Sequence, residues 1–188
     1  MIDELKNGLI LYHGSYCEVK NPDIKLCRRY KDFGQGFYLT TDFEQAENFA
    51  KLTLRKAIEN GTVEESQNYG VVSVFEYKSA ADIRVKIFET ADSDWLHCIV
   101  AHRKKNIFQE TIDLMKTYDI IGGKIADDAT NLTIMNYMAE AYGEIGSETA
   151  DEICIKMLLP DRLKNQFCFR SPNAIESLSF KECRKIWL

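Results

Sequence analysis

The stretch Lys31-Asp-Phe-Gly-Gln-Gly-Phe-Tyr-Leu-Thr-Thr41 combines two glycines with an aromatic pair and a polar boundary. Gly34 and Gly36 carry no Cβ, so the backbone can turn tightly there or approach a ligand closely. Residues 37–40 are aromatic and β-branched enough to predict a short strand. The stretch therefore predicts a glycine loop that leads directly into a strand.

A long helix is predicted immediately after this strand. Thr41 stands three residues before Glu44, which is the spacing of a capping box and marks the expected start. Apolar residues recur at helical spacing over 42–60, and Gly61 is well placed to end the helix. The order of loop, strand and helix would also suit a plain βα turn, so the rest of the chain has to distinguish the two interpretations.

The remaining chain mixes strands and helices without a regular βα alternation. Apolar and β-branched runs predict strands at 9–12, 71–77, 83–88, 118–126, 164–171 and 178–187. Helical spacing predicts helices at 93–105, 109–116, 129–142, 149–159 and 173–178, with Ser93 and Thr149 as caps. We expect the second and third strands to be separate or to form a hairpin, and the glycines of 118–126 to break or bulge that strand.

The predicted elements indicate a single α+β domain over residues 1–188. No internal repeat, low-complexity tract or linker divides the sequence. On the strand at 164–171, alternation places Phe167 and Phe169 on one face and Gln166 and Cys168 on the other. Helices inserted between the strands favour the α+β class. The glycine loop lacks both the third glycine of a dinucleotide fold and the G-K-[ST] of a phosphate loop.

Composition and charge limit the classes of partner. The chain has 188 residues, 45% of them hydrophobic, and a net charge of −5, which argues against broad electrostatic capture of nucleic acid. A basic cluster of Lys25, Arg28, Arg29 and Lys31 nevertheless precedes the glycine loop. The first residues do not resemble a signal peptide, and no apolar run approaches the ~20 residues that span a bilayer. We expect a cytoplasmic protein that does not engage the membrane.

The six cysteines have no metal-site spacing, because none forms a C-x-x-C pair. Most lie among apolar residues, as Cys154 does between Ile153 and Ile155. We therefore expect buried free thiols, no disulfide framework and no bound metal.

Three short segments resemble the ADP-ribosyltransferases of the diphtheria-toxin and poly(ADP-ribose) polymerase type. Leu11-Tyr12-His13-Gly14-Ser15 looks like their strand-end His-Gly, and Asp32-Phe33-Gly34-Gln35-Gly36-Phe37-Tyr38-Leu39-Thr40 is close to their F-G-x-G-[IF]-Y-F-A. Asn165-Gln166-Phe167-Cys168-Phe169 looks like their N-E-Y-x-V strand, with glutamine in place of glutamate. The whole chain looks closer still to a bacterial family of such proteins that is catalogued as a domain of unknown function.

The resemblance implies an ADP-ribosyltransferase-like split β-sandwich of mostly antiparallel strands with helical insertions. It also implies that NAD+ is the substrate, that the bond between nicotinamide and ribose is broken, and that ADP-ribose passes to an acceptor. Three residues would be catalytic: His13, Tyr38 and Gln166. The positions implied to contact NAD+ are His13, Gly14, Ser15, Arg28, Gly36, Phe37, Tyr38 and Phe49.

The resemblance gives several of these residues a specific role. His13 would hydrogen-bond a ribose hydroxyl, and Gly14 would offer its backbone N–H and C=O to the nicotinamide carboxamide. Tyr38 would face the nicotinamide ring, with Phe49 or Asn48 as the opposite wall. Arg28, with its neighbour in the basic cluster, would hold the pyrophosphate.

Gln166 is the departure from the family pattern. Glutamine keeps an acceptor oxygen of nearly the same reach, but it carries no negative charge and cannot act as a general base. We therefore expect transfer of a single ADP-ribose rather than chain building. Asp127 or Asp128 would be another source of a carboxylate, although Asp128 would equally serve as a helix cap.

Four functions are open from the sequence. The first is a toxin-like mono-ADP-ribosyltransferase, for which the resemblance alone implies a neutralising antitoxin partner. The second is a catalytically weak or inactive module that binds NAD+ or ADP-ribose. The third is a structural or interaction protein with a degenerate pocket, and the fourth is a nucleotide phosphotransferase. The acceptor of ADP-ribose is open between a protein, a nucleic acid and a small molecule.

Overall fold

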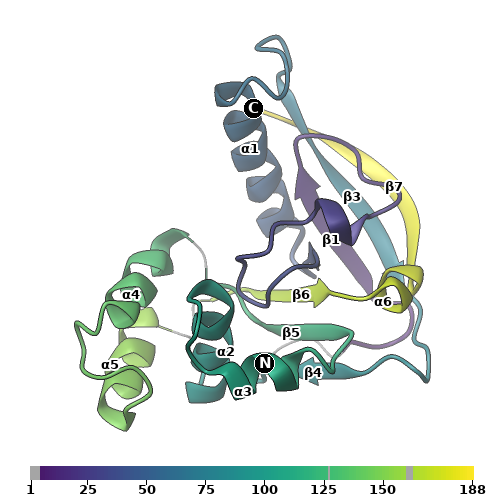
Figure 1. Cartoon of the computed structure of the whole chain (residues 1–188). Coiled ribbons are helices and arrows are strands. Elements are labelled where there is room, and N and C mark those ends of the chain that lie inside the picture. Colours follow the sequence, from purple (N-terminus) through teal and green to yellow (C-terminus); the bar gives the residue numbers. More distant parts are fainter. Residues whose placement is uncertain (1–4, 127, 160–162) are drawn as a thin grey trace.

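Two β-sheets form the centre of the molecule, and a computed structural model describes it over residues 5–126, 128–159 and 163–188 (Figure 1). The strands of sheet A have the order β1 (Ile10–Ser15), β3 (Tyr69–Tyr77) and β7 (Leu178–Trp187). The strands of sheet B have the order β2 (Phe37–Leu39), β6 (Asn165–Phe169), β5 (Ile120–Lys124) and β4 (Val85–Ile87). β4 and β5 pair in parallel and the other pairs are antiparallel, which confirms the predicted α+β class.

Helices are inserted between the strands and pack around both sheets (Figure 1). The helix α1 (Phe43–Glu59) packs against β1 and β3 of sheet A. Beside sheet B lie α2 (Ser93–Arg103) and α3 (Gln109–Met115), and α2 also contacts α5 (Glu148–Leu158). The helix α4 (Asp128–Met138) packs against α5. Along the chain, the short η1 (Ile24–Leu26) comes between β1 and β2, and α6 (Pro172–Glu176) comes directly before β7.

The two sheets are joined where β1 meets β2. The N–H of Tyr12 donates to the carbonyl of Thr40 over 2.8 Å, and the N–H of Thr40 donates back over 3.0 Å. One residue further along β1, the next bond is made by a side chain, because the His13 ring bonds the carbonyl of Tyr38. Beyond the Tyr12–Thr40 pair, no further backbone bond joins β1 and β2 within the described residues. We call this stretch the opening between β1 and β2, and the His13 ring lies at its start.

An aromatic core fills the space between the sheets. Its central rings are at most 4% exposed, and they are Phe37, Phe75, Phe167 and Phe169. Phe37 and Phe75 meet edge to face with their centroids 5.5 Å apart, which is a favourable geometry for aromatic rings. Phe167 and Phe169 lie together on this face of β6, as their alternation predicted.

A second core lies between the other face of sheet B and the helices. Trp95 of α2 is fully buried there, and its indole N–H donates to the carbonyl of Lys124 over 3.0 Å. Phe33 of the glycine loop, Ile121 of β5 and Cys168 of β6 are also fully buried in this core. The glycine loop is therefore held between sheet B and α2.

The caps of three helices lie one or two residues away from those predicted. Asp42 caps α1, since its carboxylate accepts from the N–H of Gln45 over 3.0 Å, and the predicted cap Thr41 is wrong. Asp92 likewise caps α2 in place of Ser93, and Ser147 caps α5 in place of Thr149. Each true cap accepts from the N–H three residues later, which is the bond that defines the position.

Of the two alternatives for the strands at 71–77 and 83–88, the separate strands are confirmed and the hairpin is wrong. The predicted break or bulge at the glycines is also wrong. β3 and β4 belong to different sheets, because β4 pairs in parallel with β5. Gly122 and Gly123 keep regular register with β6. A Cβ at Gly122 would lie 2.8 Å from the Phe167 ring, and one at Gly123 would lie 2.9 Å from the Phe33 ring. These glycines therefore serve close packing on both faces of sheet B.

All six cysteines are free, and Cys98, Cys154 and Cys168 are buried, whereas Cys17 and Cys183 are exposed. Within the described ranges, no three His, Cys, Asp or Glu side chains gather closely enough to hold a metal ion. No helix in the part of the chain that the structure covers is both long enough and apolar enough to cross a bilayer.

Candidate functional site

The glycine loop needs its glycines for contacts with the protein itself. Gly34 has a φ of +80°, and a Cβ there would lie 2.6 Å from the ring of His102 on α2. A Cβ at Gly36 would lie 2.5 Å from the sulfur of Cys168 on β6. The close approach that the sequence left open for a ligand is made at both positions by protein atoms.

Tyr38 fixes this loop through its hydroxyl group. The hydroxyl donates to the carbonyl of Gly34 over 2.8 Å and accepts from the N–H of Phe33 over 3.0 Å. Burial raises the pKa of Tyr38 well above its usual value, so the phenol stays neutral at physiological pH. The ring is half-buried against the second core. The Tyr38 side chain is therefore held in one position by the glycine loop that precedes it in sequence.

His13 lies at the opening between β1 and β2 with a defined tautomer. A carbonyl can only accept, so the 2.8 Å contact with Tyr38 places a proton on Nδ1 of His13. Burial lowers the pKa of His13, which keeps the ring neutral at pH 7 and leaves Nε2 as an acceptor. The ring packs on Phe37 with the centroids 4.3 Å apart.

Phe37 packs against the His13 ring from the core between the sheets. Its ring is 4% exposed in the core between the sheets, so its side chain does not face solvent as a ligand contact would. Ser15, another position implied to contact NAD+, is the last residue of β1 and is half-buried opposite Val71.

Gly14 turns its backbone groups toward the opening. Successive residues of a strand bond to opposite sides, and Tyr12 bonds across to Thr40. Gly14, two residues on, therefore directs its N–H and C=O to that same side. A Cβ at Gly14 would lie 2.0 Å from the carbonyl oxygen of Ala46, so the backbone of α1 rests directly on this glycine.

Gln166 lies in a buried polar cluster on β6. It is 6% exposed, and its Nε2 donates to Oδ2 of Asp32 over 2.7 Å. Asp32 also accepts from the N–H of Ala126 over 3.0 Å and from the Arg103 guanidinium, whose Nε lies 3.2 Å from Oδ1. The buried carboxylate of Asp32 therefore joins the glycine loop, α2 and β6.

Asp32 is the residue that sequence reasoning missed. It stands inside the quoted glycine stretch, where the residue before Phe33 received no role. Its signal in the sequence is a single acidic residue directly after a run of basic ones, which is weak by itself. Its partner Gln166 is 134 positions away, so only the folded chain brings the two together.

The three predicted catalytic residues come from three adjoining strands. His13 touches Tyr38 through the Tyr38 carbonyl. Tyr38 pairs with Cys168 in register, so Gln166, two residues from Cys168, lies on the same face of sheet B as Tyr38. Segment 32–34 contacts both Tyr38 and Gln166, since Asp32 bonds Gln166 and the carbonyl of Gly34 bonds the Tyr38 hydroxyl. Among the described bonds, none joins His13 directly to Gln166.

An exposed aromatic ring and several cations border the site. Phe49 of α1 is 39% exposed, and the ammonium of Lys31 lies 6.0 Å from its centroid. Burial lowers the pKa of Lys31, Asp32 raises it, and Arg28 and Lys56 lower it further. Arg28 is itself exposed. Positive charge is therefore concentrated beside the ring of Phe49.

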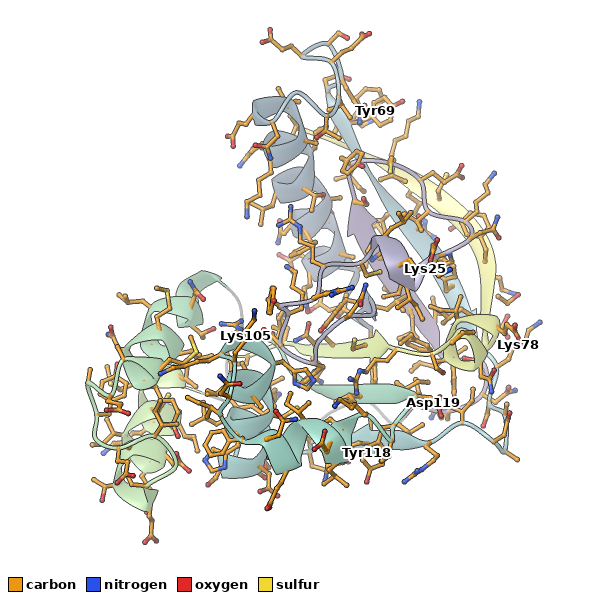
Figure 2. The ribbon with its side chains drawn as sticks, viewed as in Figure 1. Lys25, Tyr69, Lys78, Lys105, Tyr118 and Asp119 are labelled. Atoms are coloured by element: carbon orange, nitrogen blue, oxygen red, sulfur yellow. The ribbon has the colours of Figure 1, made fainter. Side chains whose placement is uncertain are left out.

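A cavity lies between the loop before β2 and the C-terminal end of α2. Its volume is about 260 Å³, and Arg29, Tyr30, His102 and Lys105 contribute to its lining. In Figure 2, the Lys105 label marks the chain just after α2, and the Lys25 label marks the loop that passes in front of sheet A. Arg29 thus borders a different space from the site, although it adjoins Arg28 in sequence.

The alternative carboxylates Asp127 and Asp128 cannot be placed at the site. Asp127 and the side chain of Asp128 lie outside the described residues. Ala126, the residue before Asp127, bonds Asp32 through its N–H.

Comparison with known protein families gives one match along most of the chain. The family model described as "Protein of unknown function (DUF3990)" matches residues 9–180. Comparison with curated proteins gives no match.

Proposed function

The chain belongs to the DUF3990 family, and from the geometry of its site we propose that it is an NAD-dependent mono-ADP-ribosyltransferase. The bond between nicotinamide nitrogen and ribose C1′ breaks, and nicotinamide leaves as a neutral molecule. C1′ then bonds to a nucleophile of the acceptor, which gives up a proton. The observation that carries the proposal is the His13–Tyr38 contact at the opening between β1 and β2, with Gln166 on the adjoining β6.

His13 anchors the ribose in this proposal. Its neutral ring has Nδ1–H committed to the Tyr38 carbonyl, so Nε2 is left to accept from a ribose hydroxyl. The packing of the ring on Phe37 holds Nε2 in one direction.

Gly14 recognises the carboxamide of nicotinamide. A carboxamide has one N–H₂ donor and one carbonyl acceptor, and the N–H and C=O of Gly14 complement both. Strand alternation directs these two groups toward the opening beyond the Tyr12–Thr40 pair.

Tyr38 and Phe49 supply aromatic surface to the nicotinamide ring. The ring is positively charged in NAD+, and a cation over a tyrosine or phenylalanine face gains roughly 0.5–2 kcal/mol. This gain is lost when neutral nicotinamide forms, so the pair favours release of the leaving group. The exposure of Phe49 leaves its ring open to a ligand.

Arg28 and Lys31 hold the pyrophosphate. Both cations lie on the loop before β2, and Lys31 stands next to the exposed ring of Phe49. Charge-assisted bonds from such groups to phosphate oxygens are stronger than neutral ones.

Gln166 faces the ribose with its amide oxygen. It accepts a hydrogen bond as a carboxylate would, but it supplies no charge to the cation-like transition state. Loss of one preorganised electrostatic partner typically costs ~10²–10³ in rate. Slow transfer of a single ADP-ribose unit is therefore the activity that the residue supports best.

A second candidate function is a module that binds NAD+ or ADP-ribose without turnover. The neutral Gln166 favours it, because an amide brings no negative charge of its own to the transition state. Binding then depends on His13, Gly14 and the cations, which are the same in both proposals.

Calorimetry and nicotinamide release distinguish the two candidates. Calorimetry measures NAD+ binding to the wild type and to His13→Ala. If the wild type does not bind NAD+ at millimolar concentration, both candidate functions are excluded. Nicotinamide release is measured in a lysate that contains acceptors, for the wild type, His13→Ala and Gln166→Ala. The matched control is Gln109→Ala, because Gln109 is exposed on α3 and bonds only Asp113 among the described residues. Binding without release above buffer would leave the second candidate standing.

The acceptor and a neutralising partner are proposals of the same kind. A toxin-like role in the cytoplasm, with an antitoxin protein, follows from the family resemblance. Labelled NAD+ in host lysate would identify the acceptor as protein, nucleic acid or small molecule. Label that stays on NAD+ or free ADP-ribose would argue against transfer.

A further inference from the structure

We propose that Asp32 is the positioning residue for Gln166. Its carboxylate, bonded to the N–H₂ group of Gln166, supplies the negative charge that the Gln166 side chain lacks. This inference rests on the proposed transfer of ADP-ribose. It assigns a role to a residue outside the three predicted catalytic positions, and the role follows from the bonds around one buried carboxylate.

The hydrogen bond to Asp32 decides which way the amide of Gln166 points. A carboxylate that is paired with arginine can only accept, so the atom 2.7 Å from Oδ2 must be the N–H₂ group of Gln166. The reverse orientation would bring two oxygens together at that distance. The amide oxygen is therefore turned away from Asp32, and it is the part of Gln166 that remains for a ribose hydroxyl.

Asp32 is itself held firmly in place. Arg103 donates to Oδ1, and the N–H of Ala126 donates to Oδ2 over 3.0 Å. Arg103 is fixed in turn by the carbonyl of Ala126 at 3.0 Å and by Oδ1 of Asn131 at 3.1 Å. A carboxylate with this many partners does not rotate freely, so the direction of the Gln166 amide is fixed as well.

The carboxylate also changes the chemistry of the amide. A hydrogen bond from the N–H₂ group to a negative charge shifts electron density toward the amide oxygen, because bonded dipoles polarise one another at low dielectric. The oxygen of Gln166 becomes a stronger acceptor as a result. Asp32 thus acts on the ribose through Gln166.

Segment 32–34 couples Gln166 to Tyr38. Asp32 bonds Gln166, while the N–H of Phe33 and the carbonyl of Gly34 bond the Tyr38 hydroxyl. One short piece of the glycine loop therefore positions the groups proposed to face the ribose and the nicotinamide.

Because Asp32 lies against Gln166, the change Gln166→Glu is not expected to restore full activity. That change restores the carboxylate of the resembled family, but it sets two carboxylates side by side. Like charges at this separation cannot both ionise freely, so one of them retains a proton. The exchange variant Asp32→Asn/Gln166→Glu keeps one amide and one carboxylate in contact. It loses the bond from the N–H of Ala126 and turns the ion pair of Arg103 with position 32 into a bond to a neutral amide oxygen.

The test compares nicotinamide release by the wild type, Asp32→Asn, Gln166→Glu and the exchange variant. We expect Asp32→Asn to lower kcat by ~10–100-fold with little change in KM for NAD+, as loss of an orienting partner typically does. We expect Gln166→Glu to stay low at neutral pH and to gain activity as pH rises. The exchange variant should exceed both single variants and lose that pH dependence.

Controls separate this role from a loss of fold. Thermal unfolding of every variant is recorded, and Asp113→Asn serves as the charge control, because Asp113 is exposed and pairs with Lys116 at the end of α3. NMR measures the pKa of the carboxyl group introduced at position 166, in Gln166→Glu and in the exchange variant. We expect this pKa to be raised in Gln166→Glu, where the carboxylate of Asp32 is still present, and to be lower in the exchange variant, where an amide replaces it.

Three outcomes would overturn the inference. Wild-type kcat in Asp32→Asn, with the wild type active, overturns it and leaves the proposed function intact. Equal pKa values for the introduced carboxyl group in both variants overturn it as well. A wild type that binds NAD+ but never releases nicotinamide removes the transferase proposal, and the role of Asp32 falls with it.

Discussion

The ring of His13 donates from Nδ1 to the main-chain carbonyl of Tyr38 over 2.8 Å, at the place where β1 and β2 part. The bond sets the tautomer of the ring and so leaves Nε2 as the nitrogen that can accept a hydrogen bond. It also ties the strand that presents Gly14 to the strand that presents Tyr38. The geometry of the candidate site therefore depends on a contact between one side chain and one carbonyl.

Nicotinamide release is expected to depend on neutral His13. Protonation turns Nε2 into a donor, and burial lowers the pKa of His13 below its ordinary value of 6.5. Activity should therefore stay level as pH falls to that value and decline only below it. His13→Gln keeps an acceptor and does not titrate, so its profile should lack the acid decline. A decline centred above 6.5 in the wild type would contradict this role.

Acid is expected to destabilise the fold through two buried histidines. Burial lowers the pKa of both His13 and His102. The unfolded chain then binds their protons more readily, so the free energy of unfolding falls as pH drops below the ordinary value of 6.5. Each unit of difference contributes about 1.4 kcal/mol per group. Urea unfolding at about pH 7.5 and about pH 5.5 measures the loss. Equal stability at both would show that the rings are not buried in solution.

Tyr38→Phe is expected to loosen the glycine loop more than it weakens NAD+ binding. The change removes the hydroxyl that bonds Phe33 and Gly34 but keeps the aromatic face. A buried group left without its partner costs roughly 1–3 kcal/mol. Chemical denaturation gives the stability and calorimetry gives the affinity. Tyr38→Ala should lower both, since it removes ring and hydroxyl together. Unchanged stability of Tyr38→Phe would mean that the hydroxyl does not hold the loop.

Gly34→Ala is expected to cost more stability than Gly61→Ala. Both glycines have positive φ, +80° and +67°, so both substitutions carry the backbone strain. A Cβ at Gly34 also meets His102, whereas nothing lies within 4 Å of one at Gly61. The difference, roughly 1–3 kcal/mol for overpacking, should shrink in a His102→Ala background. Equal losses for the two glycines would exclude the His102 contact as the cause.

Lys31→Gln is expected to weaken NAD+ binding and to reduce its dependence on salt. Lys31 lies 6.0 Å from the Phe49 ring, among the cations proposed to hold the pyrophosphate. Removing one phosphate partner should flatten the loss of affinity with ionic strength. Lys185→Gln is the matched control, because Lys185 stands 4.2 Å from the Tyr69 ring on sheet A, away from the loop. Equal effects of the two changes would refute a specific phosphate role.

Local patterns in the sequence predicted most elements of the fold. Alternation on β6 gave the two faces correctly, and β7 was predicted with its observed bounds. Caps were missed by one or two residues, since Asp42 and Ser147 compete with equally suitable neighbours. The parallel pairing of β4 with β5 could not be predicted, because strand pairing depends on contacts distant in sequence.

The residues of the candidate site were also predicted only in part. The resemblance pointed to His13, Tyr38 and Gln166, and the structure brings His13 to Tyr38 and places Gln166 on the adjoining strand. Phe37 was expected at a ligand and is buried under His13 instead. Asp32 had no role because its four donors come from β6, α2 and the segment after β5, none of them near it in sequence.

The position of β6 in sheet B bears on how the protein is made. This strand lies between β2 and β5, yet it follows both of them in the chain. Until it emerges, sheet B has no middle strand, and Asp32 and Arg103 lack the Gln166 side chain. Under the proposed function, a growing chain therefore gains its activity only when β6 has been made and has inserted between the strands that precede it.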